Sequence, residues 1–402
     1  MVIPDITQLP GWFYFAFLFA TGCCVGSFLN VVIYRLPLGR SLVTPGSACP
    51  SCGRHIWFYD NIPLLSWIML GGKCRYCKKR ISVRYFFIEL LTGLMFIGFF
   101  AMFFYSDLRQ GIPEFWQGGW LVYAVTVVMM AALIAASAID FERQIIPLSI
   151  CWFVTFFGFF ASALAPSIID PAAITQYVIF PTTDDIIIRK ASTIATLSAG
   201  AGVGLLISLM LIWSGLLKRS YDIDEEKEVS VHAGHIDPET ESQFNDRLEM
   251  LKEILFLLPI ILGAIAALLM VKYDYRVGAW WHGVIQKPQV AGLLGSMWGY
   301  FIGAGIVWLM RIFGTLAFGR EAMGLGDVHL MGAVGTITGS LIVVSAFFIA
   351  PFFGLAWALV QMFFKKTRQI PYGPFLSLGV LVGIIQHDRI LAYLVSIFYP
   401  QI

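Results

Sequence analysis

The sequence predicts an all-α polytopic membrane protein that carries one small cytoplasmic zinc-binding domain. Hydrophobic residues make up 58% of the 402 residues and charged residues only 13%, with a mean hydropathy of +0.78. A soluble domain is less apolar than this. The apolar residues are grouped in runs of about 20, the length with which a helix crosses a bilayer. Two Cys-x-x-Cys pairs lie in a polar segment between the first two runs.

We expect about ten transmembrane helices, because ten apolar runs can be delimited, near residues 11–33, 84–104, 120–139, 147–165, 192–217, 253–271, 290–317, 326–339, 341–364 and 374–398. The first run is expected to be a retained helix, because Met1–Pro10 lacks the basic residues of a cleaved signal peptide. The run at 326–339 is short and rich in glycine, so we expect a tilted helix or one partly covered by protein.

The chain is expected to have three parts. Residues 1–33 form the first transmembrane helix and residues 34–83 a cytoplasmic zinc-binding domain. Residues 84–402 form a membrane domain with an inserted helix pair and an acidic cytoplasmic loop near 192–271. The 34–83 segment is strongly basic and is therefore placed in the cytoplasm. Counting helices from there places the remaining basic clusters on the same side, at Lys218-Arg219, Arg320 and Lys365-Lys366-Arg368.

The two Cys-x-x-Cys pairs predict a structural metal site. Cys49 and Cys52 form the first pair, and Cys74 and Cys77 form the second. Four thiolates can surround one tetrahedral ion, and zinc is the usual occupant. Four protein ligands leave no open position for a substrate. A redox dithiol or a disulfide is the alternative, and a cytoplasmic location disfavours the disulfide.

Two aspartates predict a second site. Asp327 lies in the sequence Gly324-Leu-Gly-Asp at the start of an apolar run, and Asp140 lies at the end of another. The helix count places both at the cytoplasmic membrane face. A carboxylate at a membrane helix is costly and usually functional. Two carboxylates that share a site titrate apart, so one can activate water while the other polarises a peptide carbonyl, as in aspartic proteolysis.

Each aspartate also has a simpler interpretation. Asp140 could be a solvated helix-end charge beside Arg143, and Asp327 could be the N-cap of the next helix. Glu142 lies two residues after Asp140 and competes for its role. Near the membrane edge, Glu89 is expected to pair with Arg84 or to cap a neighbouring segment.

The sequence resembles the prepilin peptidases, or type IV leader peptidases, which are GxGD aspartic proteases. The two Cys pairs take part in the resemblance. The other motifs follow the order of the family along the chain: Gly26–Pro37, Asp60–Trp67, Arg84–Leu91, Ile139–Pro147, Glu321–Leu330 and Ile370–Leu376.

The resemblance implies two activities. The first is cleavage of the leader peptide of type IV prepilins or type II secretion pseudopilins, with Asp140 and Asp327 as the catalytic aspartates. The second is methylation of the new N-terminal amine with S-adenosylmethionine, because family members with the four-cysteine domain are bifunctional. Gly72 and Lys73 match positions associated with the methyl transfer. The expected location is the bacterial inner membrane, with the active site on its cytoplasmic side.

The expected partners are prepilin or pseudopilin substrates, the lipid bilayer and pilus or secretion-system assembly proteins, and no nucleic acid. Two departures from the family stand out. His329 replaces a usual lysine, and the helices near 192–217 and 253–271 are additional. The alternatives are an intramembrane aspartic protease without methyl transfer and a transporter that uses the aspartates as a proton or cation relay. A zinc-bearing membrane scaffold is the third alternative, and it gives no reason for the two carboxylates.

Overall fold

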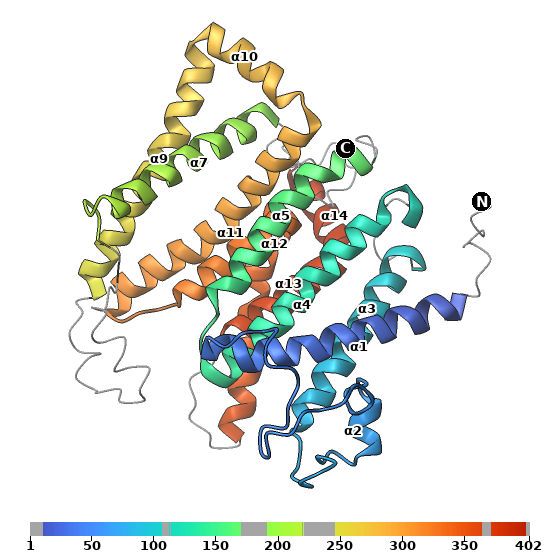
Figure 1. Ribbon diagram of the computed structural model, residues 1–402. Helices are drawn as coiled ribbons and strands as arrows, with labels where there is room; N and C mark the ends of the chain where they lie inside the picture. The colour runs from blue at the N-terminus through green and yellow to red at the C-terminus, as the bar shows by residue number, and fades with distance from the viewer. Residues whose placement is uncertain are drawn as a thin grey trace. The chain divides into compact units, whose positions relative to one another are not determined.

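The computed structural model describes residues 11–106, 112, 114–169, 191–218, 220, 246–363 and 371–398, as the ribbon in Figure 1 shows. Within these ranges the regular elements are helices, accompanied by two isolated β-bridges. Among the described residues, eight helices are long and apolar enough to cross a membrane. The chain is therefore an all-α, multi-pass membrane protein, as predicted. It divides into two compact units, Met1–Val154 with Phe348–Ile402, and Thr155–Phe347.

The first unit is built around a buried helix, α4 (Gly119–Arg143), whose apolar residues are mostly inaccessible to solvent. The unit also contains α1 (Gly11–Arg35), η2 (Leu36–Leu38), η3 (Phe58–Asp60), α2 (Leu65–Met69), α3 (Val83–Phe104), η4 (Phe115–Gln117), the start of α5 (Leu148–Ile168), the end of α12 (Leu325–Phe363), α13 (Gly373–Ile385) and α14 (His387–Phe398). Glycines let α1 and α3 touch, since a Cβ on Gly26 would lie 2.7 Å from the Cα of Glu89.

The second unit contains α7 (Ala191–Trp213), α9 (Asp246–Tyr273), α10 (Tyr275–Ile285), α11 (Pro288–Phe318) and the remaining parts of α5 and α12. The helices α7 and α9 lie side by side, with α10 following the far end of α9 (Figure 1). They match the additional runs near 192–217 and 253–271. Gly204 makes their contact possible, because a Cβ there would lie 2.2 Å from the carbonyl oxygen of Pro259. Residues 221–245 of the expected acidic loop lie outside the described residues.

The sequence and the structure divide two apolar stretches differently. The runs near 326–339 and 341–364 form one 39-residue helix, α12, interrupted at Gly339, where φ is 76° and ψ is 178°. Glycine adopts this backbone without a Cβ clash, so the chain changes direction without a polar loop. The run near 374–398 is divided into α13 and α14, which meet at 73° and can together count as a ninth span. The short α10 was not expected. Its start is capped by Asp274, whose side chain accepts the amide N–H of Arg276 at 2.9 Å.

Candidate functional site

The four cysteines of the 34–83 segment converge. Cys49, Cys52, Cys74 and Cys77 each offer a sulfur, and all four sulfurs lie within 4.8 Å of one another. The sulfurs of Cys49 and Cys77 are 3.9 Å apart. This is too far for a disulfide, which needs about 2.05 Å. It is close to the roughly 3.8 Å edge of a tetrahedron built from zinc–sulfur bonds of about 2.3 Å.

The two Cys-x-x-Cys turns have the same backbone design. In each, the N–H of the first cysteine donates to a carbonyl five residues on, from Cys49 to Arg54 and from Cys74 to Lys79, both at 2.9 Å. The residue after the second cysteine has a positive φ in both turns, 70° at Gly53 and 58° at Lys78. Two matching turns bring their sulfurs together in an arrangement that could hold a metal ion such as zinc.

The sulfurs of the second turn have different environments. The pKa of the Cys74 thiol is lowered to about 7, because the backbone N–H groups of Cys77 and Tyr76 donate to its sulfur. At Cys77 the Lys79 N–H lowers the pKa, but burial and the neighbouring cysteines raise it to about 11. A metal-bound cysteine must be a thiolate, so only Cys74 is favoured in the ligating form before a metal binds. The donor set and the spacing are compatible with zinc, and the described residues support the metal-binding interpretation over a disulfide.

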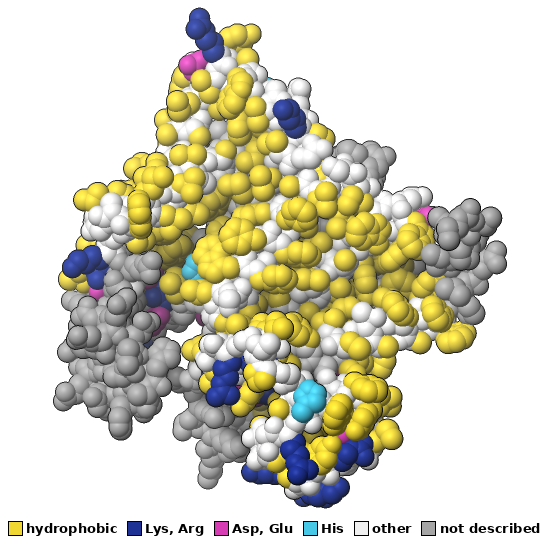
Figure 2. Space-filling view, in the orientation of Figure 1, with side chains coloured by type: hydrophobic (Ala, Val, Ile, Leu, Met, Phe, Trp, Pro, Cys, Tyr) yellow, Lys and Arg dark blue, Asp and Glu magenta, His cyan; other side chains and the backbone are white. Residues whose placement is uncertain are grey.

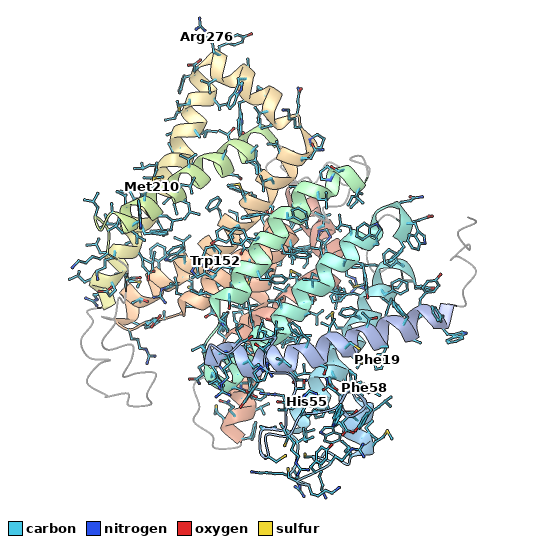
Figure 3. The ribbon with its side chains drawn as sticks, viewed as in Figure 1. Phe19, His55, Phe58, Trp152, Met210 and Arg276 are labelled. Atoms are coloured by element: carbon cyan, nitrogen blue, oxygen red, sulfur yellow. The ribbon has the colours of Figure 1, made fainter. Side chains whose placement is uncertain are left out.

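A basic surface surrounds the cysteine cluster. Figure 2 shows Lys and Arg side chains gathered over the segment that carries His55 and Phe58 in Figure 3. One arginine is fixed internally: Arg75 donates from Nε to both carboxylate oxygens of Asp60, at 3.0 and 2.8 Å. This contact lowers the pKa of Asp60, chiefly through the hydrogen bond from Arg75. The pair connects the loop before α2 to the second cysteine turn.

Gly72 has a structural role in this domain. Its φ is 66°, and a Cβ on it would lie 2.8 Å from the indole ring of Trp67. Its carbonyl oxygen accepts the N–H of Ile81 at 2.7 Å. Any side chain at Gly72 would therefore disturb the approach to the second cysteine turn, where Lys73 forms an isolated bridge with Arg80. A substitution at Gly72 that abolishes function could therefore act by disturbing this packing, and it would not by itself show that Gly72 takes part in methyl transfer.

Asp140 lies buried at the cytoplasmic end expected for α4. Only 6% of its surface is exposed, so it is not a solvated helix-end charge. Its Oδ2 accepts the N–H of Gly373 at 2.9 Å. Gly373 is the first residue of α13, so the positive end of that helix faces the carboxylate. A Cβ at this position would lie 2.7 Å from Oδ2, so a larger residue would require the carboxyl or the start of α13 to move. Sequence reasoning missed this contact, although Gly373 lies in one of the motifs shared with the family.

The neighbouring acids are held differently. Glu142 has a 42% exposed side chain and pairs with Arg84 from α3. Glu89 does not pair with Arg84. Its Oε2 accepts the N–H of Leu64 at 2.8 Å, so of the two expected roles it has the capping one. Leu64 is held at a φ of 60°, unusual for a bulky residue, so Glu89 stabilises a strained turn. Of the two candidates in α4, Asp140 is therefore the buried one.

Asp327 lies in the second unit, in the first turn of α12. The helix begins at Leu325, so Asp327 is inside the helix and is not its N-cap. It is 8% exposed, and its N–H donates to the carbonyl of Gly324 at 3.2 Å. The helix N-terminus stabilises an ionised carboxylate there. His329 lies on the same first turns of α12. Asp140 and Asp327 belong to different compact units.

Glycines set the position of α12 within its unit. A Cβ on Gly299 of α11 would lie 1.9 Å from the carbonyl oxygen of Gly335, and one on Gly303 would lie 2.3 Å from that of Met331. Small residues at this spacing let two membrane helices touch backbone to backbone. Ser296 adds a hydrogen bond to the carbonyl of Thr336 at 2.6 Å. This contact fixes the helix that carries Asp327 against α11.

The part of the chain that contains the cysteine cluster also matches known proteins. Residues 20–103, which contain α1, the cysteine cluster and α3, match the family model described as Bacterial Peptidase A24 N-terminal domain. The resemblance to the prepilin peptidase family is confirmed.

The chain is similar to several curated members of this family. It is 45% identical over 147 residues to a prepilin leader peptidase/N-methyltransferase of Myxococcus xanthus, covering 36% of this chain and 39% of that protein. It is 37% identical over 171 residues to a protein of the same name from Pseudomonas aeruginosa, covering 35% and 54%. It is 41% identical over 144 residues to the type 4 prepilin-like proteins leader peptide-processing enzyme of Escherichia coli, covering 31% and 48%.

In these comparisons the chain spans between 39% and 54% of the length of the prepilin peptidases that it matches. No solved structure matches the chain. The family match covers the cysteine cluster with Gly72 and Lys73. The roles of Asp140 and Asp327 therefore depend on the geometry described above and on the motifs around them.

Proposed function

We propose that this chain is a bifunctional prepilin peptidase. It removes the leader peptide of type IV prepilins or type II secretion pseudopilins and methylates the new N-terminal amine. The similarity to prepilin leader peptidase/N-methyltransferases carries this proposal. The basic cysteine domain, which such a bifunctional member is expected to have, supports it.

The peptidase step is assigned to Asp140 and Asp327. In the proposed reaction the ionised carboxylate takes a proton from water, and the hydroxide formed adds to the peptide carbonyl while the protonated carboxyl donates to its oxygen. The tetrahedral intermediate then collapses: one of its hydroxyls returns a proton to the second carboxylate, and the amine leaves with the proton from the first carboxyl. The N–H of Gly373 on Asp140 Oδ2 holds that carboxyl in one orientation. The burial of each aspartate supports this assignment over a solvated role.

The methyl-transfer step needs S-adenosylmethionine, which supplies an activated methyl group to the neutral amine that cleavage releases. We assign this activity to the cysteine domain, with Gly72 and Lys73 contributing, and zinc would be held by the four cysteines. Zinc there is structural: it joins two turns that have no extended core of their own. The two reactions would occur in sequence on one substrate, because the accepting amine exists only after cleavage and must lose its proton to act as a nucleophile.

The proposed location is the inner membrane, with cleavage at its cytoplasmic side. The basic 34–83 segment supports this, because basic loops remain in the cytoplasm. Lys365, Lys366 and Arg368, expected on the same side, lie outside the described residues. Pilus or secretion-system assembly proteins are proposed partners, since the product of the reaction is a subunit of such assemblies.

The test uses purified protein in detergent with a type IV prepilin, with and without S-adenosylmethionine, followed by mass spectrometry. Wild type should release the leader and then gain one methyl group on the mature subunit. Asp140→Asn and Asp327→Asn should each abolish cleavage. Glu142→Gln should retain it, because Glu142 is exposed and engaged with Arg84. Cleavage without methyl gain would indicate a protease alone, and cleavage by both aspartate variants would refute the assignment and favour an ion-transport role.

A further inference from the structure

A buried charged cluster connects the additional helix α9 to the loop that precedes Asp327. At its centre is Arg311 of α11, which is 1% exposed. Its Nε donates to both oxygens of Glu253 from α9, at 3.0 and 3.2 Å. The same carboxylate accepts the indole N–H of Trp308 at 2.7 Å and the hydroxyl of Ser220 at 3.1 Å. Glu253 is itself 3% exposed, so the pair is screened from solvent.

The other edge of the guanidinium holds the loop between α11 and α12. The Nη1 group of Arg311 donates to the carboxylate of Glu321 and to the backbone carbonyl of Met323. A third contact comes from Thr315, whose hydroxyl accepts the N–H of Ala322 at 3.1 Å. Helix α12 begins at Leu325, two positions after Met323, and carries Asp327 in its first turn. The loop that leads into the aspartate is thus fixed mainly by one arginine.

The chemistry of arginine explains how α9 can fix the position of the loop before Asp327. The guanidinium is a rigid plane with donors in fixed directions, so its contact with one partner sets its angle to the other. Glu253 determines the orientation of Arg311, and Arg311 determines where Glu321 and Met323 lie. A buried ion pair of this kind adds little stability over an apolar replacement, because both charges lose their hydration. Its effect is instead to fix the positions of the groups that Arg311 contacts.

We infer that Arg311 and Glu253 are positioning residues for Asp327, and that the additional helix α9 orders the Gly-x-Gly-Asp loop for cleavage. This inference rests on the proposed function. It gives the helix pair α7 and α9 a role in the reaction, since their glycine contacts hold Glu253 in place. At Gly263 of α9, for example, a Cβ would lie 2.5 Å from the carbonyl of Gly200.

The test compares Glu253→Gln and Arg311→Lys with a matched control, Glu249→Gln. Glu249 lies one turn earlier on α9, is also buried, and pairs with Lys252 at 2.7 Å. Glutamine keeps the shape of Glu253 but removes its charge. Lysine keeps the charge of Arg311 but lacks the planar group whose donors point in fixed directions. For each purified full-length variant, prepilin cleavage gives kcat and KM, hydrogen–deuterium exchange reports on residues 319–327, and size-exclusion chromatography verifies folding.

We expect both variants to lower kcat at least about tenfold with KM within about twofold of wild type, because ordering of the reacting group is lost while substrate binding is kept. Exchange of the 319–327 amides should rise in the same variants and not in Glu249→Gln. If Glu253→Gln fails to fold, Trp308→Phe removes one hydrogen bond to Glu253 and should show the same changes to a smaller degree.

The results separate this inference from the proposed function. Absence of cleavage by wild type itself would overturn the proposed function. If wild type cleaves, an unchanged kcat in Glu253→Gln and Arg311→Lys would overturn the inference, whether or not exchange rises. An equal loss in Glu249→Gln would also overturn it, because the effect would then belong to α9 in general.

Discussion

Replacing Gly373 by alanine should disturb Asp140 without changing any charge. The new Cβ would lie 2.7 Å from Asp140 Oδ2 and 3.2 Å from Ile146 Cδ1. The first distance is shorter than real Cβ contacts, so the carboxyl or the start of α13 must move. The movement breaks the 2.9 Å hydrogen bond from the Gly373 N–H. A hydrogen bond to a charged group contributes about 1.5–3 kcal/mol, and overpacking costs about 1–3 kcal/mol.

A loss of about 1.5–3 kcal/mol at the reacting carboxyl corresponds to roughly a 10- to 150-fold decrease in kcat. Prepilin cleavage by purified protein measures it, with a thermal melt to verify folding. The matched control is Gly354→Ala in α12, where a Cβ would meet only Phe375, at 3.7 Å, an ordinary contact. Cleavage by Gly373→Ala at the wild-type rate would refute the reasoning, because Asp140 would then need neither this hydrogen bond nor this orientation.

Four further predictions concern stability. Purified protein should contain one zinc ion per chain by elemental analysis, and a chelator should increase proteolysis within 34–83, because metal binding supplies much of the folding energy of that domain. Lys78→Gly should stabilise it by roughly 1 kcal/mol in thermal or denaturant unfolding, because Lys78 has a left-handed backbone. The pKa of Asp60 is lowered by Arg75 in the folded state. The stabilisation from this pair should therefore be present above the unfolded pKa of about 3.9 and be lost as pH falls through the folded value, and Asp60→Asn should remove that pH dependence. Gly299→Ala should destabilise the protein in detergent because its Cβ would lie 1.9 Å from a carbonyl of α12, whereas Gly305→Ala on the same helix has open space.

The sequence was informative wherever the signal is local. Spacing alone identified Cys49, Cys52, Cys74 and Cys77, since two short turns must bring their sulfurs together. The length of the apolar runs identified the membrane spans, because a helix must have this length to cross a bilayer whichever helices it packs against. The same rule could not distinguish one kinked helix from two at Gly339, since no charged residue marks the backbone break there.

Long-range contacts needed the tertiary structure. Arg84 pairs with Glu142, which is 58 positions away, and not with nearby Glu89. Gly373 reaches Asp140 over 233 positions. No periodicity or local spacing encodes such pairs, because the choice of partner depends on how helices pack.

The sequence by itself determined that this is an all-α membrane protein with a four-cysteine site and two aspartates at helix ends. These properties follow from hydropathy and short-range geometry. Only the tertiary structure decided that Asp140 is buried against the first turn of α13, and that Arg311 connects α9 to the loop before Asp327. The reason is physical: burial and hydrogen-bond partners arise when distant segments exclude water from one another, and this depends on the packing of the whole unit.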